Sequence, residues 1–441
     1  VRDRVGIKPL YFGIQKNILF FSSELKAIRA HPSFDAELDF NNLALFFRHD
    51  YIPAPFCVYK DLQKLLPGHF AVISMDSKIK VVNYWDIREI SSREGKESLD
   101  LSENKAENTL ESLLLDSVNF RMRSDVPLGA FLSGGVDSSL IVALMQAQSS
   151  LPVKTFTIGF NEDKFNEAQY AKKVAEHLGT EHTELYVKSE QAQEVIPRIS
   201  DIYDEPFSDS SQIPTFLVSQ LTRRHVTVSL SGDGGDELFA GYNRYFWAED
   251  IWKKTGSMPR PLKYVLSGAI RSVSSNGRDS FFSRTRFLMP DIFRQWMPGG
   301  RRHKLIEFFN CRTADDLYKR FISHWKEPQE LVITAKEPST VIGDRSLVRE
   351  IPSFVDRMMF LDLVTYLPDD ILTKVDRASM AVSLEVRVPM LDHRVIEFSK
   401  NLPLNLKIRS EKSKWILRKI LYKYIPEKII ERPKMGFGIP I

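Results

Sequence analysis

Short apolar runs alternate with longer amphipathic segments between residues 106 and 230, and no other feature of the sequence limits the fold as strongly. Strands are expected at 126–132, 153–159, 182–187 and 226–230, and helices at 110–121, 138–147, 167–178 and 213–223. Parallel strands need long crossover connections, which are usually helices. The alternation therefore predicts an α/β fold, with a parallel sheet covered by helices on both faces.

The segments on either side of this region have different patterns. Residues 1–88 contain short apolar runs at 10–13, 18–21, 70–73 and 80–85, which are typical of strands, with helices expected at 23–30 and 41–47. Residues 87–105 are polar and charged and form the best candidate linker. From Tyr242 to 430 the pattern is almost wholly helical, and residues 253–350 suggest no role. We expect two domains, at 1–88 and 106–441, because 441 residues exceed one ordinary core.

The composition narrows the class of protein. Hydrophobic residues make up 43% of the chain and charged residues 27%, as in globular proteins, and the formal charge is only +4. Long basic tracts are absent, so neither nucleic acid nor a membrane is expected as a partner. Cys57 and Cys311 are the only cysteines, without metal-ligand spacing. Their scarcity excludes a disulfide framework and favours a reducing cytoplasm.

A glycine-rich loop follows the first strand expected in the second domain. Residues 133–138 read Ser-Gly-Gly-Val-Asp-Ser and lie between an apolar strand and an amphipathic helix. At such a junction, backbone N–H groups and the helix dipole favour an anion, and glycines allow phosphate to approach closely. The spacing differs from a Walker loop, and no Lys follows the glycines. Asp137 in a phosphate loop indicates an intervening divalent cation, since carboxylate and phosphate repel.

This loop resembles the pyrophosphate loop of the ATP-pyrophosphatase superfamily. The resemblance implies an adenine-nucleotide α-hydrolase-like fold and cleavage of ATP between its α and β phosphates. It also implies that Ser133, Gly134, Gly135, Asp137 and Ser138 bind ATP. The alternative is an ordinary Gly-Ser turn that caps a helix, which the full motif between strand and helix disfavours.

A second glycine-rich loop, rich in acids, follows the expected strand at 226–230. Residues 231–237 read Ser-Gly-Asp-Gly-Gly-Asp-Glu. If this strand and the strand at 126–132 are neighbours, both loops lie at the carboxyl edge of the sheet, where such folds bind ligands. Asp137 and Asp236 would then share one Mg²⁺ with the pyrophosphate oxygens. A plain acidic turn that caps the next helix is the alternative.

Residues 231–242 are similar to the signature of glutamine-dependent asparagine synthetases. The similarity implies that Ser231 and Gly232 contact ATP and that Asp233 supports formation of the acyl-adenylate. It places Leu132 and Ile158 beside the adenine, although plain sheet core is an open alternative for both. Many family members carry Glu at the position of Asp233 and Ala or Ser at that of Gly235.

Two C-terminal motifs carry further candidates. The segments 369–377 and 384–392 resemble the asparagine synthetase family, and Asp370 is a candidate catalytic residue. Glu385, Arg387 and Asp392 are expected to pair where they are buried, either as a structural network or against substrate. Residues 432–438 form a Pro/Gly-rich loop with Lys434. The resemblance places the family's catalytic lysine at Lys434, which would neutralise charge on departing pyrophosphate.

Residues 2–11 and 21–27 resemble the later half of class II glutaminase domains, which have an Ntn-type α+β fold. Those enzymes use an N-terminal Cys as nucleophile. The chain opens at Val1, and Cys57 is rejected as a nucleophile because it is internal. We therefore expect a fragment, truncated at both ends, that does not hydrolyse glutamine itself.

Taken together, the resemblances predict a carbon–nitrogen ligase that uses ATP and Mg²⁺. Aspartate would be activated as β-aspartyl-AMP with release of pyrophosphate, and ammonia from glutamine would convert it to asparagine. Three alternatives stay open: an amidotransferase for another carboxylate such as a sugar acid, a β-lactam-synthetase-like cyclase, and a non-catalytic paralogue. A homodimer is also left open.

Overall fold

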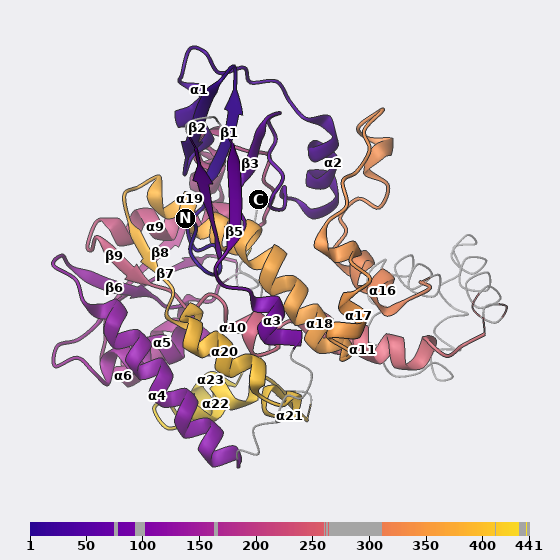
Figure 1. Ribbon diagram of the computed structural model, residues 1–441. Coiled ribbons are helices and arrows are strands. Elements are labelled where there is room, and N and C mark those ends of the chain that lie inside the picture. Colours follow the sequence, from indigo (N-terminus) through magenta and orange to yellow (C-terminus); the bar gives the residue numbers. More distant parts are fainter. Residues whose placement is uncertain are drawn as a thin grey trace, which may run out of the picture.

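The computed structural model describes residues 1–74, 78–92, 102–162, 166–259, 261, 263, 311–410, 412–431 and 438 (Figure 1). Its largest sheet has five parallel strands in the order β10-β9-β6-β7-β8. In chain order they are β6 (Leu128–Phe131), β7 (Lys154–Phe160), β8 (Glu181–Val187), β9 (Val228–Leu230) and β10 (Glu385–Arg387). The predicted parallel sheet is confirmed. Its fifth strand, β10, was missed, because this segment was expected to be helical.

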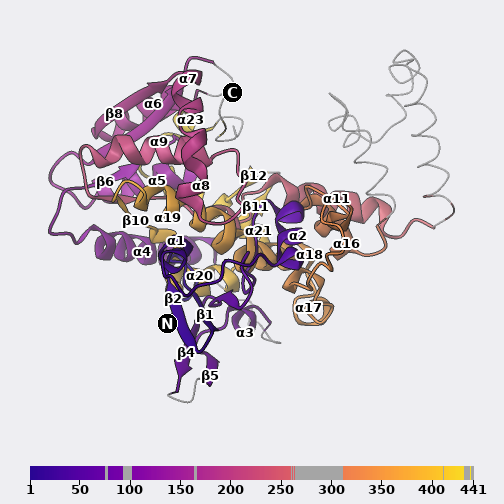
Figure 2. The same cartoon turned by 90° about the horizontal axis from the view of Figure 1, so that it is seen from above.

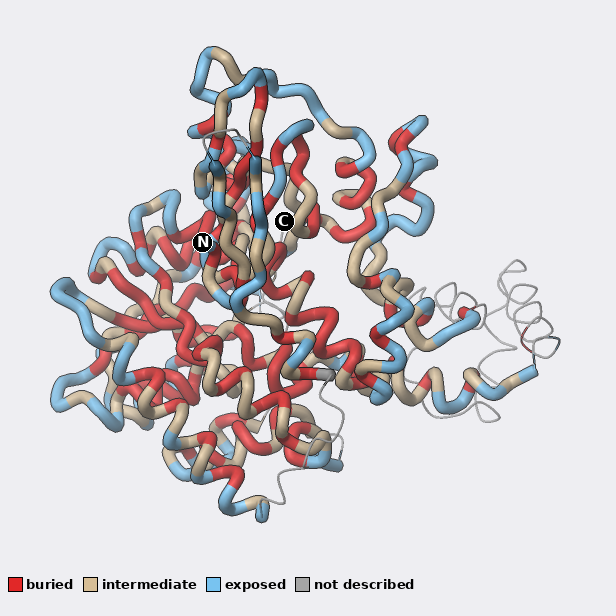
Figure 3. Tube along the Cα trace, in the orientation of Figure 1, coloured by how far each residue is buried: buried red, intermediate tan, exposed pale blue. Residues whose placement is uncertain are grey.

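Helices cover both faces of this sheet. On one face lie α4 (Glu103–Met122), α5 (Val136–Gln146) and α6 (Ala168–Leu178), which share one hydrophobic core. On the other face α9 (Gln212–Arg223) packs against β7, and α19 (Thr373–Met380) packs against α9 and β10. Figure 3 shows the resulting buried layer through the centre of the molecule.

The N-terminal part forms two small antiparallel sheets. The first has the order β2-β1-β3, from β1 (Tyr11–Gln15), β2 (Ile18–Ser22) and β3 (Leu62–Lys64). The second pairs β4 (His69–Ile73) with β5 (Ile79–Asn83). Helices α1 (Leu25–Arg29) and α2 (Phe40–His49) complete this part. Figures 1 and 2 show these strands to one side of the parallel sheet, and α2 packs against η3 (Pro328–Glu330). Helix α16 spans Ala314–Phe321.

The expected linker is partly wrong. Residues 87–92 form α3 (Ile87–Ser92), and α4 begins at Glu103; residues 93–101 lie outside the described part. Arg88 of α3 pairs with Asp344 at 2.9 Å and with Glu350 at 2.6 Å. These two ion pairs dock α3 on the helical region, which the polar composition of the segment did not predict.

A long helix runs through the C-terminal half and carries several acids. It consists of α18 (Phe354–Leu361), a π-helical stretch η5 (Asp362–Leu372) that contains Pro368, and α19. Proline disrupts the ordinary α-helical hydrogen bonds, and π-helical turns often lie at functional sites. In Figure 1 this orange helix passes directly below the N-terminal strands.

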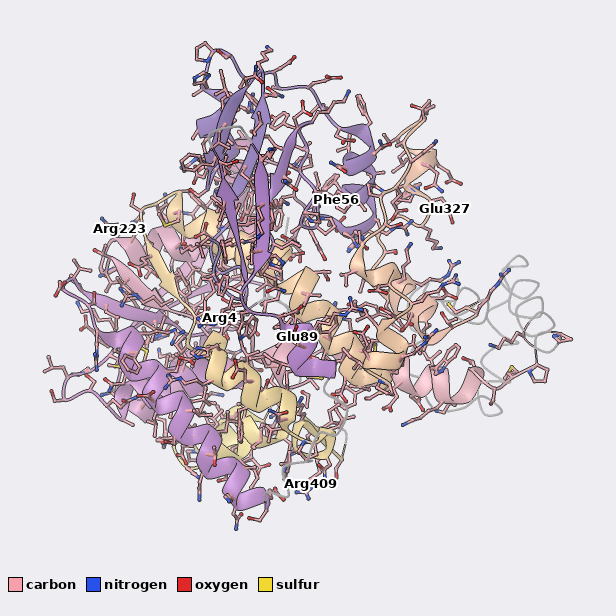
Figure 4. All side chains as sticks on the ribbon, viewed as in Figure 1. Arg4, Phe56, Glu89, Arg223, Glu327 and Arg409 are labelled. Carbon is pink, nitrogen blue, oxygen red and sulfur yellow. The ribbon has the colours of Figure 1, made fainter. Side chains whose placement is uncertain are left out.

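The remaining elements fill the space around these layers. Near the sheet lie α7 (Ser189–Gln193), η1 (Ile196–Arg198), α8 (Ile199–Tyr203) and α10 (Gly235–Leu238), whereas α11 (Asn243–Thr255) packs against α16 and α18. Further along are η3 (Pro328–Glu330), η4 (Val341–Gly343), α17 (Leu347–Glu350), η6 (Pro389–Leu391), α20 (His393–Asn401), α21 (Leu404–Lys407), β11 (Ile408–Arg409), β12 (Lys412–Ser413), α22 (Trp415–Leu421) and α23 (Glu427–Ile430). Arg409, labelled in Figure 4, pairs with Glu103 at 2.9 Å and ties β11 to α4. Within the described residues, no helix combines the length and apolar character that a membrane crossing requires.

Glu205 joins the N-terminal part to the rest of the chain. Its carboxylate accepts hydrogen bonds from the Tyr11 hydroxyl at 2.9 Å and from the Val58 backbone N–H at 2.8 Å. It also pairs with Lys64 at 2.8 Å, and both side chains are buried, at 7% and 9% exposure. All three partners belong to the N-terminal part. This one carboxylate therefore stabilises the interface between the N-terminal part and the rest of the chain.

Glu205→Ala is expected to lower the free energy of unfolding by about 3–5 kcal/mol, because removing one partner of a buried pair leaves the other charge uncompensated. Denaturant unfolding measures the change. The matched control is Glu385→Ala, since Glu385 is 49% exposed beside Arg387. An exposed pair contributes at most about 1 kcal/mol. Equal losses in the two variants would contradict the role of Glu205.

Candidate active site

The phosphate loop connects β6 to α5, as the sequence predicted. Gly134 has φ +73°, and a Cβ there would lie 2.7 Å from the backbone N of Ala171. A side chain is therefore excluded both by conformation and by space. Gly135 caps the N-terminus of α5 without a side-chain hydrogen bond. The loop thus presents backbone groups at a helix N-terminus, the arrangement that binds phosphate.

The two serine hydroxyls of this loop hold it closed on itself. Ser133 Oγ and Ser138 Oγ lie 2.9 Å apart, and Ser138 Oγ accepts from the Ser133 backbone N–H at 3.2 Å. Ser133 Oγ also accepts from the Gly135 N–H at 3.3 Å. Hydroxyls rotate freely, so the same groups can donate to phosphate oxygens.

The second loop lies against the first. Strands β6 and β9 are parallel neighbours, with Leu128 opposite Val228 and Ala130 opposite Leu230. A Cβ at Gly232 would lie 2.7 Å from the Ser138 backbone N, and one at Gly235 would lie 2.5 Å from the Asp137 carboxyl carbon. The glycines of the second loop therefore permit direct contact between the two loops. The predicted meeting at one sheet edge is confirmed.

Asp137 and Asp236 converge on one cation, the ammonium group of Lys414. Lys414 Nζ lies 2.7 Å from Asp236 Oδ1 and is also bonded to Asp137 Oδ2. Burial alone would lower the pKa of Lys414, but the two carboxylates raise it above its ordinary value. The sequence reasoning missed Lys414. It precedes α22 with φ +56°, and nothing local in the sequence signals this conformation or its partners.

This arrangement suits a divalent cation held with phosphate. Mg²⁺ is bound in nucleotide sites by one or two carboxylates together with phosphate oxygens and water. Asp137 and Asp236 provide such a pair, and a positive charge already lies between them. Among the described residues no group of three or more His, Cys, Asp or Glu could hold a metal alone. The donor set therefore fits a metal that arrives with its nucleotide.

Of the other two acids of the second loop, Glu237 is buried and Asp233 is partly buried. Ser231 Oγ donates to Asp233 Oδ2, and burial raises the pKa of Asp233. Glu237 accepts from the Tyr242 hydroxyl at 2.6 Å, and burial, followed by the nearby Asp236 charge, raises its pKa to about 8. A carboxyl with this pKa is largely neutral at pH 7. Glu237 therefore supports the loop, while Asp236 carries the charge that faces Lys414.

Leu132 and Ile158 lie in the hydrophobic core, exposed by 1% and 2%. The Leu132 backbone N–H donates to Phe156 O at 2.9 Å, which continues the sheet beyond β6. These contacts give both residues a structural part in the sheet. Their predicted place beside adenine stays a prediction.

Asp370 lies on η5 and interacts with Asp209 and Lys374. Asp370 and Asp209 line a cavity to which neither glycine-rich loop contributes. Lys374 pairs with Asp209 at 3.3 Å. Neither Asp209 nor Lys374 was among the predicted site residues. The spacing of four between Asp370 and Lys374 was a usable signal for Lys374. Lys434 lies outside the described residues.

The acids of the segment 384–392 do not form the expected single buried network. Glu385 pairs with Arg387 at 2.7 Å on β10, but Glu385 is half exposed. Asp392 instead pairs with Arg394 at 2.9 Å and with Arg121 at 3.2 Å. Residues 385–387 form a strand, so the helical interpretation of this segment was wrong.

Cys57 is fully buried in the N-terminal part. Burial raises the pKa of its thiol, which opposes the thiolate that a nucleophile requires. This agrees with its rejection as a glutaminase nucleophile.

Gly241→Ala is expected to weaken binding of Mg²⁺-ATP by about 10–100-fold, as loss of groups that orient metal ligands does. A Cβ at this position would overlap both Asp236 Oδ1 and Lys414 Cε and would push the two charges apart. Calorimetric titration measures the affinity. Gly343→Ala is the control, because no described atom lies within 4 Å of its added Cβ. Unchanged affinity in Gly241→Ala would show that the spacing of Asp236 and Lys414 is not critical.

Comparison with known proteins places this geometry in a family. The asparagine synthase family model matches residues 109–441, and the glutamine amidotransferase domain model matches residues 1–85. Asparagine synthetase [glutamine-hydrolyzing] 1 of Bacillus subtilis is 32% identical over the whole chain, which spans 65% of that relative's length. A putative asparagine synthetase of Methanocaldococcus jannaschii is 33% identical over 88% of the chain and 70% of its own length.

More distant relatives carry other names. Amidase chry2 of Gibberella zeae is 23% identical over the whole chain, which covers 67% of that protein. The match of the first model to most of the chain, with both glycine-rich loops inside it, decides the assignment. This chain belongs to the asparagine synthase family, with a glutamine amidotransferase-type domain at its N-terminal end.

Proposed function

We propose that this chain activates aspartate with ATP as β-aspartyl-AMP and converts the adenylate to asparagine with ammonia. The observation that carries the proposal is the convergence of Asp137 and Asp236 on one cation position from neighbouring strands. Two carboxylates at the carboxyl edge of a parallel sheet suit a metal-bound pyrophosphate. The names of the similar proteins support asparagine as the product.

In this proposal the chain's own residues bind and orient the nucleotide. The backbone of Gly134 and Gly135 and the hydroxyls of Ser133 and Ser138 donate to the pyrophosphate oxygens. Asp137 and Asp236 hold Mg²⁺, which when bound neutralises pyrophosphate charge. The other predicted contacts stay as proposed: Leu132 and Ile158 beside adenine, Ser231 and Gly232 on ATP, Asp233 and Asp370 at the acid, and Lys434 on the leaving pyrophosphate.

The source of ammonia belongs to the same proposal. Residues 1–88 are proposed as part of a glutaminase domain and residues 106–441 as the synthetase domain, with α3 crossing the first boundary. The bonds of Glu205 to Tyr11, Val58 and Lys64 hold the two parts together. A fixed interface of this kind suits delivery of glutamine-derived ammonia from one part to the other. The complete protein is accordingly proposed as a carbon–nitrogen ligase with glutamine as amide donor.

Product analysis with aspartate, ATP, Mg²⁺ and ammonium tests the proposal. Asparagine, AMP and pyrophosphate are expected in equal amounts. Formation of ADP and phosphate would overturn it, because cleavage would then occur at the γ-phosphate. Pyrophosphate exchange that depends on a sugar acid and not on aspartate would assign another amidotransferase. Failure to bind Mg²⁺-ATP would favour a non-catalytic paralogue.

A further inference from the structure

Residues 203–212 connect the interface with the N-terminal part to a charged cluster that acts on the second glycine-rich loop. The segment begins at Tyr203, the last residue of α8, and reaches Gln212, the first residue of α9. Its first residues contact the N-terminal part, and its later residue Asp209 pairs with Lys374. The proposed reaction gives this segment no role.

The turn at the start of this segment is strained. Asp204 has φ +59° and ψ −42°, which lies outside both the right-handed and the left-handed helical regions. The Glu205 backbone N–H donates to Tyr203 O at 2.6 Å, so the three residues form a γ-turn of the rare form with positive φ. A residue with a side chain persists in such a conformation only where the surrounding structure imposes it.

Most contacts that hold this turn come from the N-terminal part. The Asp204 side chain is 1% exposed, and its Oδ2 accepts from the Leu25 backbone N–H at 2.9 Å, at the start of α1. Arg377 of α19 pairs with the same carboxylate at 3.6 Å. The next residue, Glu205, pairs with Lys64 of β3 at 2.8 Å. Two consecutive carboxylates thus hold the strained turn through their contacts with the N-terminal part.

The segment is braced between the turn and α9. The Tyr203 ring stacks on that of Phe207, with a centroid distance of 4.7 Å and an interplanar angle of 4°. The Tyr203 hydroxyl donates to Gln212 O at 3.3 Å, at the start of α9. The Ser208 backbone N–H donates to Asp50 O at 2.8 Å, which adds a further contact with the N-terminal part. A displacement of the turn therefore also moves the residues before α9.

Asp209, near the far end of the segment, fixes Lys374. The two side chains pair at 3.3 Å and are only 13% and 8% exposed. Lys374 also interacts electrostatically with Asp370 and with Asp233 of the second loop. Helix α10, which continues that loop, packs against η5, the stretch that precedes Lys374. The position of the positive charge that acts on Asp233 therefore depends on Asp209.

We infer that the γ-turn at Asp204 is a conformational device that places Asp209 and Lys374 correctly for the second loop only while the N-terminal part is docked. Docking holds the turn in its strained form. When the contacts are lost, Asp204 relaxes to an ordinary conformation and Asp209 moves away from Lys374. The inference rests on the proposed function, in which Asp233 acts in formation of the acyl-adenylate. Asp209 and Lys374 are then positioning residues.

A matched pair of variants separates backbone strain from side-chain contact. Asp204→Gly and Asp204→Ala lose the same carboxylate, but only glycine adopts this φ without strain. In Asp204→Ala, kcat for aspartate-dependent ATP–pyrophosphate exchange is expected to be about 10-fold lower than in Asp204→Gly, the factor that strain of this kind produces. The KM for ATP should be the same in both, because the glycine-rich loops are unchanged. Equal kcat values in the two folded variants, whatever their stabilities, would overturn the inference.

Docking itself is weakened from the N-terminal side by Lys64→Met, which removes the ionic partner of Glu205. This variant is expected to lower kcat by about 10-fold, and to have little effect when combined with Asp204→Gly, which keeps the turn without strain. Arg88→Met is the control. It removes both ion pairs of α3 with the helical region but no contact of residues 203–212. Its kcat should stay unchanged, and equal losses in Lys64→Met and Arg88→Met would contradict the device.

Failure of the proposed function would look different. In that case the unchanged chain would show no pyrophosphate exchange with aspartate at all. Amide hydrogen exchange then tests the inference by itself, because it needs no substrate. Lys64→Met is expected to speed hydrogen exchange at residues 205–215 and 373–380 by about 10-fold through local opening, whereas Arg88→Met leaves both segments unchanged. Unchanged protection of these segments in Lys64→Met would overturn the inference.

Discussion

Asp137→Asn is expected to slow aspartate-dependent ATP–pyrophosphate exchange by about 10²–10³-fold, the cost of losing one group that stabilises developing charge in a closed site. In the described part of the chain, Asp137 is one of the two carboxylates that pair with the Lys414 ammonium at the cation position. The amide keeps the size of the side chain but removes its negative charge. The midpoint of a Mg²⁺ titration should also move to higher concentration, because only Asp236 then holds the metal.

The control for this prediction is Asp116→Asn. Asp116 is 42% exposed on α4, and its carboxylate pairs with Arg394 and not with Lys414. Exchange and the Mg²⁺ midpoint should both stay unchanged in this variant. If Asp137→Asn kept the normal exchange rate and the normal Mg²⁺ midpoint, the proposed Mg²⁺ site at Asp137 would be wrong.

The part of the site that could be predicted is the part encoded locally. Residues 133–138 and 231–237 each follow an apolar strand and precede a helix, so their position at a sheet edge follows from the alternation of elements. Their mutual contact followed from one further assumption, that β6 and β9 are neighbours. The parallel pairing of these strands confirms it.

The missed features depend on contacts between distant segments. Strand β10 has three residues, two of them charged, and it is a strand only because it pairs with β9. Lys414 reaches Asp137 across 277 positions in the sequence. Asp209 precedes α9 in a loop, and its pairing with Lys374 depends on how α9 packs against α19. Local periodicity contains no information about such pairings.

The surroundings of Asp370 could not be predicted from the sequence. The almost wholly helical pattern from Tyr242 to 430 includes residues 369–377 but does not show which way each side chain points. Adjacent side chains on any helix point in different directions. Asp369 accepts from the Ala54 N–H, whereas Asp370 lines the cavity. Two adjacent acids thus have different surroundings, which the sequence does not distinguish.

Lys414→Met is expected to lower the free energy of unfolding by about 3–5 kcal/mol in the absence of Mg²⁺, because it leaves two carboxylates facing each other without a counter-charge. Asp137 and Asp236 are only 17% and 22% exposed, so water screens their repulsion poorly. Methionine fills nearly the same volume, so loss of packing adds little. Denaturant unfolding without Mg²⁺ measures the loss of stability, and unfolding with Mg²⁺ measures how much of it the metal restores.

Added Mg²⁺ should restore much of this loss, since a ligand at 100 times its Kd contributes about 2.7 kcal/mol. The unchanged chain should gain far less, because Mg²⁺ there competes with the Lys414 ammonium for the same two carboxylates. Lys419→Met is the control, since Lys419 pairs with Glu103 and Glu107 on α4 and lies 29% exposed. Its stability should not respond to Mg²⁺ differently from that of the unchanged chain. If Mg²⁺ stabilised Lys414→Met no more than the control, Lys414 would not occupy the place of the metal, and Asp137 and Asp236 would serve only to position a structural lysine.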